Sequence, residues 1–190
     1  MEPFRTLTSL AAPLPLKDVD TDLIIPASFL TSIAREGFAE GLFDRLRRSD
    51  PRFFMNDPRF RNARILVAGA NFGCGSSREH AVWALQGAGF RVIIGSSFAD
   101  IFSANAAKNG LLLVRLSSDE VASILAAAQE ADLMLTVDLG SQTVSRPDGT
   151  VYRFEHDPFR KTCLLDGLDD LDYLLCHARE IRAHFAGRRQ

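Results

Sequence analysis

The chain has 190 residues, of which 46% are hydrophobic and 24% charged. This is the composition of a folded globular domain rather than of a disordered or collagen-like chain. The formal net charge is -2, so there is no overall excess of Lys and Arg with which to gather nucleic acid or an anionic membrane. No apolar run approaches the roughly 20 residues of a membrane span. We therefore expect a single cytoplasmic domain over residues 1–190.

The cysteines Cys74, Cys163 and Cys176 are odd in number and widely spaced, so a disulfide framework is not expected. No pair has the C-x2-C spacing, and no His lies three to five residues from a Cys. Those spacings are typical of self-contained zinc sites and many iron–sulfur sites. The sequence therefore predicts a reduced protein that binds no metal itself.

Strand-type and helix-type segments alternate from residue 64 to residue 138. Arg64–Ala68 is a short run of apolar, mostly branched residues that predicts a buried strand, and Ser76–Leu85 predicts the next helix. The same reasoning predicts strands over Phe90–Ile94, Leu111–Val114 and Leu133–Asp138, and helices over Ser97–Lys108 and Ser117–Glu130. Such alternation predicts an α/β fold with a mixed, largely parallel sheet and helices packed on it.

The C-terminal part of the chain is expected to contain one more strand region and two helices. Gln142–Phe154 predicts a strand region, and the turn Pro147-Asp148-Gly149 inside it is typical of a hairpin. Asp157 followed by Pro158 is typical of a helix cap and a first helical residue. A last helix is expected from about Leu168.

The segment from about residue 26 to residue 58 mixes Arg with Asp and Glu and is broken up by Gly37 and Gly41. Long inserts in a compact domain are either solvated surface loops or functional lids. Both interpretations stay open, and the second predicts a mobile loop that gates the substrate site.

The most informative stretch is the loop Gly69–Gly75, between a predicted strand and a predicted helix. Three glycines in seven residues allow tight turns and the close approach of a ligand to main-chain N–H groups. The N-terminus of the next helix adds unsatisfied donors and the positive end of the helix dipole, which favour a carboxylate or phosphate at Ser76–Arg78. Arg78 is suited to form a bidentate fork on the same anion.

Spacing excludes the better-known glycine-loop motifs. A dinucleotide fingerprint requires a third glycine where this chain has Arg78, and a P-loop requires a Lys before its Ser. A nucleophile elbow requires G-x-S-x-G, whereas the chain has Gly75-Ser76-Ser77.

Ser76 has two interpretations. It is a helix cap that forms a capping box with Glu79, as Ser117 and Glu120 are expected to do. Alternatively it is a catalytic serine, because an alkoxide is least unfavourable at a positive helix end beside an Arg. The residues alone leave both open.

Cys74 and His80 flank the same junction. Cys74 is either a thiol nucleophile or a residue that lines the glycine turn, and the second interpretation is favoured because no contact with His80 is assured by the spacing. For His80 we favour a structural, hydrogen-bonding role.

Five motifs in this order resemble the small subunits of 3-isopropylmalate dehydratases, which form the swivelling domain of the aconitase superfamily. They are Val19–Pro26, Asn71–Ala81, Ser97–Phe102, Lys108–Leu111 and Asp157–Lys161. The resemblance covers nearly the whole chain. It implies a layered β/β/α swivelling domain whose segment from about 26 to 58 is a mobile substrate-recognition loop.

The resemblance also implies roles for individual residues. Ser76 corresponds to the catalytic base, Ser77 and Arg78 to residues that bind a substrate carboxylate, and Arg35 to the Arg of the recognition loop. The remaining candidates are Thr21 and Asp22, which are expected to position polar groups of the substrate, and Asn71, Gly73 and Gly75, which support the loop. An alternative for Asp20-Thr21-Asp22 is an Asx-type turn before a strand at Leu23–Ile25.

The activity implied is that of a hydro-lyase of leucine biosynthesis, which isomerises 2-isopropylmalate and 3-isopropylmalate by dehydration and rehydration. Elimination of water requires a base on one carbon and a Lewis acid on the departing hydroxyl. The resemblance implies that the Lewis acid is a [4Fe-4S] cluster on a separate large subunit, so the active protein is a heterodimer or higher heteromer. Two alternatives stay open: a related hydratase of methyl-substituted malate or citraconate, and a non-catalytic anion-binding regulatory module.

Overall fold

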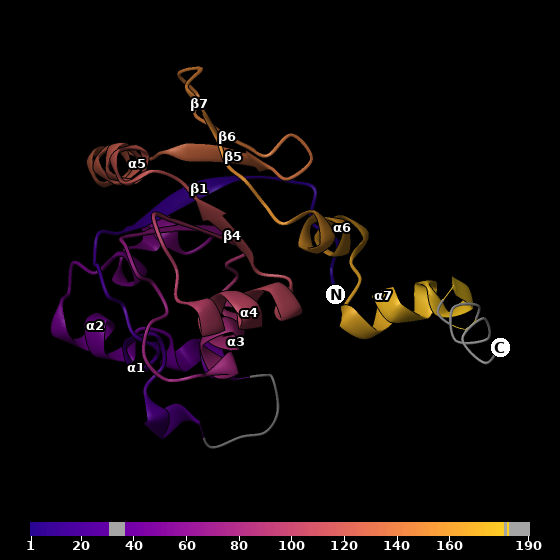
Figure 1. Ribbon diagram of the computed structural model, residues 1–190. Helices are drawn as coiled ribbons and strands as arrows, with labels where there is room; N and C mark the ends of the chain where they lie inside the picture. Colours follow the sequence, from indigo (N-terminus) through magenta and orange to yellow (C-terminus); the bar gives the residue numbers. More distant parts are fainter. Residues whose placement is uncertain (31–36, 181, 183–190) are drawn as a thin grey trace.

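The computed structural model of the chain describes residues 1–30, 37–180 and 182 (Figure 1). Within them, seven strands form one sheet in the order β4-β3-β2-β1-β5-β6-β7. The strands are β1 (Thr6–Leu14), β2 (Ile65–Ala68), β3 (Val92–Gly95), β4 (Leu112–Arg115), β5 (Met134–Asp138), β6 (Thr143–Ser145) and β7 (Val151–Arg153). β1 to β4 pair in parallel, and β1–β5, β5–β6 and β6–β7 are antiparallel. The predicted α/β fold with a mixed sheet is confirmed.

Helices cover both faces of the parallel half of the sheet (Figure 1). The α-helices of the described residues are α1 (Thr21–Ile24), α2 (Asp44–Ser49), α3 (Glu79–Gly87), α4 (Asp100–Asn109), α5 (Ser118–Glu130), α6 (Pro158–Asp166) and α7 (Asp170–Cys176). α3 and α4 bury Leu85 and Phe102 on one face, and α5 buries Ile124 on the other. Because β2 and β3 are covered on both faces, all their residues are buried, which is why they read as continuous apolar runs.

The central strand β1 is not among the strands predicted from the sequence. Its first half, Thr6–Leu10, pairs with β5, and its second half, Ala11–Leu14, pairs with β2. The interior Pro13 ordinarily argues against a central strand, because proline has no N–H to donate. Here the Ala11 N–H makes the last bond to the β5 side, at the Leu133 carbonyl. Alternate residues of a strand direct their main-chain nitrogens to the same neighbouring strand, so the nitrogen of Pro13 faces β5, as that of Ala11 does. The pairing with β5 has already ended there, and no hydrogen bond of the sheet is lost.

The boundaries of α3 and of the hairpin differ from the prediction. α3 begins at Glu79 instead of Ser76, and its N-cap residue, Arg78, makes no side-chain capping bond. The capping-box interpretation of Ser76 is therefore wrong. The region predicted as a strand over 142–154 is the β6–β7 hairpin, whose turn contains the predicted Pro147-Asp148-Gly149.

The strand expected at Leu23–Ile25 is also wrong, because the chain forms the short helix α1 there. Asp20 is its N-cap, and the Asp20 carboxylate accepts the Leu23 N–H at 2.6 Å. In a short apolar run, periodicity alone does not distinguish a strand from a helix. The capping Asp at the start decides the outcome.

The segment predicted as a mobile recognition loop is largely packed where the structure describes it. After residue 36 it contains α2 and the 3-10 turns Phe38–Gly41 and Phe54–Asn56, and it buries Phe38, Leu42, Phe43 and Phe54 in the same core cluster as α3. Arg35 lies outside the described residues. The mobility of the segment stays a prediction, and any movement of residues 37–58 must open this aromatic core.

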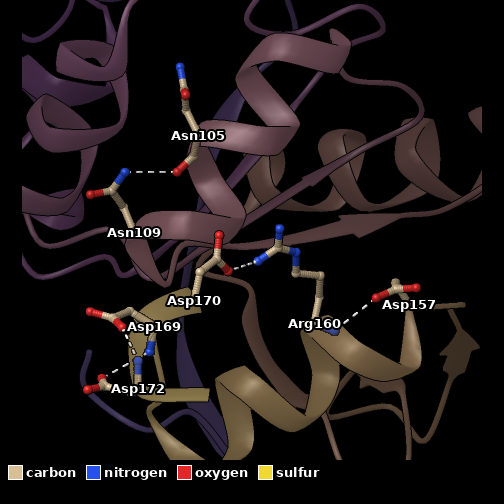
Figure 2. A network of polar contacts seen from close by, with 7 residues as sticks. All are labelled: Asn105, Asn109, Asp157, Arg160, Asp169, Asp170 and Asp172. Atoms are coloured by element: carbon tan, nitrogen blue, oxygen red, sulfur yellow. Dashed lines mark hydrogen bonds and ion pairs between the residues drawn. The ribbon is translucent and has the colours of Figure 1, made fainter. Parts of the chain in front are cut away.

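The chain leaves the sheet through α6 and α7 (Figures 1 and 2). Asp157 caps α6 as predicted, through the Arg160 N–H at 2.9 Å. The Arg160 guanidinium is paired with Asp170 at 2.5 Å, which ties α6 to the start of α7. Within the described ranges, no helix is long and apolar enough to cross a membrane.

Candidate active site

The glycine loop between β2 and α3 is held in left-handed backbone conformations. Asn71, Gly73 and Gly75 have φ angles of 57°, 79° and 88°, a region that side chains other than those of Gly, Asn and Asp rarely adopt. At Gly73 a Cβ would lie 2.3 Å from the Phe102 ring, so α4 packs directly on the loop backbone. The predicted supporting role of these residues therefore has a steric basis, although their role in catalysis stays a prediction.

Residues 18–22, which end the connection after β1 and begin α1, lie directly against this loop. The Gly73 N–H donates to the Val19 carbonyl at 2.7 Å, and the Thr21 N–H donates to the Cys74 carbonyl at 2.9 Å. The Asn71 side-chain amide donates to the Asp18 carboxylate at 2.7 Å. These bonds join two segments that are more than 50 residues apart in sequence, and both follow neighbouring parallel strands at their carboxyl edge.

Thr21 holds the main chain of Ser76. Its side chain is only 3% exposed, and its hydroxyl donates to the Ser76 carbonyl at 3.0 Å. The single proton of the Thr21 hydroxyl is therefore already used in a hydrogen bond to the loop. The predicted contact of Thr21 with a substrate stays a prediction, and the structure gives Thr21 the additional role of positioning Ser76.

Ser76 and Ser77 are exposed at the surface of the loop. Neither hydroxyl has a hydrogen-bond partner within the described part of the chain. Arg78 is largely covered, and its Nη1 donates to Asp22 Oδ1 at 2.5 Å and to the Ile25 carbonyl at 3.4 Å. The Nη2 and Nε groups make no hydrogen bond to the described residues, so donors remain with which to bind a carboxylate.

Asp22 is held in its charged form by this contact. The hydrogen bond from Arg78, followed by the positive charges of Arg78 and of Arg45 on α2, lowers the pKa of Asp22 below its ordinary value of 3.8. The sequence analysis did not single out Arg45. Its helix reaches α1 only through the tertiary fold, and nothing in the local sequence marks it.

We expect replacement of Arg78 by Met to return the pKa of Asp22 towards 3.8. The folded-state pKa is the lower one, so the contribution of the pair to stability is present above about pH 4 and is lost as the pH falls through the folded-state pKa. Titration of the Asp22 carboxyl carbon by NMR measures this directly. Arg45→Met is the matched control and should raise the pKa less, whereas an unchanged Asp22 pKa in Arg78→Met would contradict the assignment.

Two substitutions of the buried Thr21 should have similar effects on stability but different effects on turnover. Thr21→Val removes the bond to the Ser76 carbonyl and Thr21→Ser removes a buried methyl, so each should lower the free energy of unfolding by about 1 kcal/mol. Only Thr21→Val should also reduce turnover, because only it releases Ser76. Denaturant unfolding and steady-state kinetics of both variants provide the comparison, and equal turnover in the two would argue against the positioning role.

Cys74 lines the glycine turn, as favoured from the sequence, whereas His80 has a structural role through ring packing and not, among the described residues, through the expected hydrogen bond. Burial, then the negative charges of Asp20 and Asp18, raise the pKa of the Cys74 thiol above 9.0, which keeps it protonated and poorly nucleophilic at neutral pH. The ring of His80 packs edge-on against Phe38 and Trp83, with centroids 5.0 and 4.9 Å away.

The cysteines lie in three different places: Cys74 in the glycine loop, Cys163 buried in α6 and Cys176 exposed at the end of α7. Over residues 1–30 and 37–180, no three His, Cys, Asp or Glu side chains gather as metal ligands. The described donors therefore do not fit an iron–sulfur cluster, which needs several thiolates at one point.

The sheet order and the glycine loop define a domain of the aconitase C-terminal type, since the family model described as the aconitase C-terminal domain matches residues 1–119. A second family model, LeuD_N, matches residues 123–158. The 3-isopropylmalate dehydratase small subunit of Francisella tularensis subsp. novicida is 54% identical, over 93% of each chain. That of Paramagnetospirillum magneticum is 49% identical, over 100% of this chain and 97% of its own. The chain belongs to the family of 3-isopropylmalate dehydratase small subunits.

A solved structure supports the same conclusion. The crystal structure of 3-isopropylmalate dehydratase (leuD) from Methanocaldococcus jannaschii superposes with a TM-score of 0.70 at 26% sequence identity, over 97% of this chain and 99% of that one. The mixed α/β fold of this chain is thus shared with a solved 3-isopropylmalate dehydratase structure.

Proposed function

We propose that this chain is the small subunit of a hydro-lyase that interconverts 2-isopropylmalate and 3-isopropylmalate by removing and re-adding water. Family membership supports the reaction, because relatives about half identical over almost the whole chain bear that name. The single structural observation that carries the assignment of residues is the exposed Ser76 hydroxyl. It is unpartnered among the described residues and lies two residues before Arg78, whose guanidinium is anchored by Asp22.

Ser76 is the base of the proposed mechanism. Its alkoxide removes the proton from the substrate carbon next to the one that loses hydroxide, and the pair of electrons becomes the double bond of the alkene. Returning the proton and hydroxide with their positions exchanged gives the isomer. An alkoxide is a strong base, and the positive charge of Arg78, two residues further on, lowers the free energy of its negative charge.

Arg78 and Ser77 bind one substrate carboxylate in this proposal. The bond from Arg78 to Asp22 fixes the direction of the guanidinium, and the remaining donors on Nη2 and Nε are presented to the ligand. A fixed fork holds the reacting carbon at a constant distance from Ser76. Positioning of this kind contributes a large part of the rate enhancement of many enzymes.

Ser76 and Ser77 are exposed at the end of the glycine loop, so a partner must exclude water from the reaction. A cavity of about 600 Å³ lies along β4, lined by residues such as Leu113 and His156, away from this loop. We infer that the large subunit covers the loop and carries a [4Fe-4S] cluster, which supplies the Lewis acid for the departing hydroxyl. Recognition of the substrate by Arg35 and the segment around residues 26–58 belongs to the same proposal.

Reconstitution tests the proposed function. The chain is mixed anaerobically with a cluster-bearing large subunit, and turnover of 2-isopropylmalate, methyl-substituted malate and citraconate is compared. We expect the highest kcat/KM for 2-isopropylmalate and no turnover by either chain alone. Preference for citraconate would favour the related hydratase, and tight anion binding without turnover would favour a regulatory module.

A further inference from the structure

Three side chains from one face of α3 meet at a single residue of α4. Glu79, Trp83 and Gln86 are spaced by four and three residues, so they form one stripe along the helix. All three bond Asn109, the last residue of α4. The stripe runs nearly the whole length of α3, so this one residue contacts the helix at its start, its middle and its end.

The side-chain amide of Asn109 uses both of its N–H donors and its oxygen in hydrogen bonds. Its Nδ2 donates to Glu79 Oε1 at 2.7 Å and to the Asn105 carbonyl at 2.9 Å, the latter drawn in Figure 2. Its Oδ1 accepts the Trp83 indole N–H at 3.0 Å, and its main-chain carbonyl accepts from Gln86 at 2.7 Å. The orientation of the amide follows from chemistry, because an indole only donates and a carboxylate only accepts.

The position of α3 matters because the catalytic loop runs straight into it. Arg78 is the N-cap residue of α3 and makes no side-chain capping bond of its own. Glu79 is the next residue, and its carboxylate is the group that Asn109 holds. A shift or rotation of α3 along this contact therefore moves Arg78 and, through the loop, Ser76.

We propose that Asn109 is a positioning residue for the reaction. It fixes the start of α3 against α4 and thereby holds Ser76 and Arg78 in the correct positions relative to the substrate. This inference rests on the proposed function. Asn109 acts through Glu79 and touches no substrate. A glycine in the left-handed conformation, Gly110, ends α4 directly after it, so the amide is carried at a sharply defined helix end.

Asn109→Asp tests the proposal with almost no change of shape. The new carboxylate still accepts from Trp83, but it cannot donate to Glu79 and instead faces it as a like charge. We expect kcat/KM of the reconstituted complex to fall by at least about tenfold. Adding Glu79→Gln in the same chain exchanges the amide and the carboxylate, restores one donor and one acceptor, and should return kcat/KM to within about threefold of the wild type.

Ser117→Ala is the matched control, because it destabilises a distant helix, α5, by removing its capping box. It should lower the melting temperature while leaving kcat and KM unchanged. If Asn109→Asp lowers melting as this control does and leaves kcat/KM unchanged, Asn109 is merely structural and the proposal is wrong. The absence of rescue by Glu79→Gln would also overturn it.

Hydrogen exchange on the isolated full-length chain separates this inference from the proposed function. Asn109→Asp should accelerate exchange of residues 76–83 by at least about tenfold and leave β5 and β6 unaffected. Gln86→Met, which removes only the last bond of the stripe, should give a smaller acceleration and serves if the first variant does not fold. Unchanged exchange at residues 76–83 overturns the inference whatever the activity. An inactive wild-type complex, together with accelerated exchange in the variant, refutes the proposed function but still supports the positioning of α3 by Asn109.

Discussion

Ser76→Ala should reduce turnover of the reconstituted complex by about 100-fold to 10,000-fold, the range contributed by a positioned general base. The same substitution should change the free energy of unfolding by less than about 0.5 kcal/mol. The reason is that Ser76 does not cap α3: the helix begins at Glu79, and the Ser76 hydroxyl has no partner among the described residues. Steady-state kinetics and denaturant unfolding of one variant measure both effects.

The second S-x-x-E motif of the chain provides the control for this prediction. Ser117 forms a complete capping box with Glu120, at distances of 3.3 and 2.8 Å. Ser117→Ala should therefore destabilise the protein by about 1 kcal/mol and leave the kinetics unchanged, the reverse of the result for Ser76. A Ser76→Ala variant with near-normal turnover would show that another group is the base.

Arg78→Lys should lower kcat/KM by at least about tenfold, corresponding to about 1.4 kcal/mol of transition-state binding. Lysine keeps the charge but loses the planar fork, so it cannot bond Asp22 and a substrate carboxylate in two fixed directions at once. We expect most of the fall in kcat/KM to come from a higher KM and not from a lower kcat, because the carboxylate is bound in both the ground state and the transition state. Kinetics with a substrate amide that lacks this carboxylate identify the contact: the penalty should disappear there.

Asp22→Asn is the companion variant for Arg78. It removes the anionic partner that holds the guanidinium while leaving all donors of Arg78 in place. The expected result is a smaller loss than that of Arg78→Lys, with a broader distribution of bound orientations and a reduced kcat. Wild-type kinetics in both Arg78→Lys and Asp22→Asn would assign the pair to stability alone.

Several parts of the fold could be predicted because they depend on residues close together in sequence. The buried runs of β2 and β3, the Ser117 capping box and the Asp157-Pro158 helix start all appear as expected. Each of these is decided by apolar content or by a cap within a few residues. The start of α3 was misjudged because the motif of Ser76 and Glu79 has the same local form as a real capping box.

By itself, the sequence determined the α/β class, the glycine loop, its junction with Ser76–Arg78 and the family to which these motifs belong. Only the tertiary structure decided which groups these residues contact. Arg78 meets Asp22 across 56 residues, Thr21 meets Ser76 across 55, and Asn109 meets Glu79 across 30. Local propensities act over a few residues and carry no information at that range. These contacts exist because β1, with its unforeseen central place, lies beside β2, so that the segments following both strands meet at one edge of the sheet.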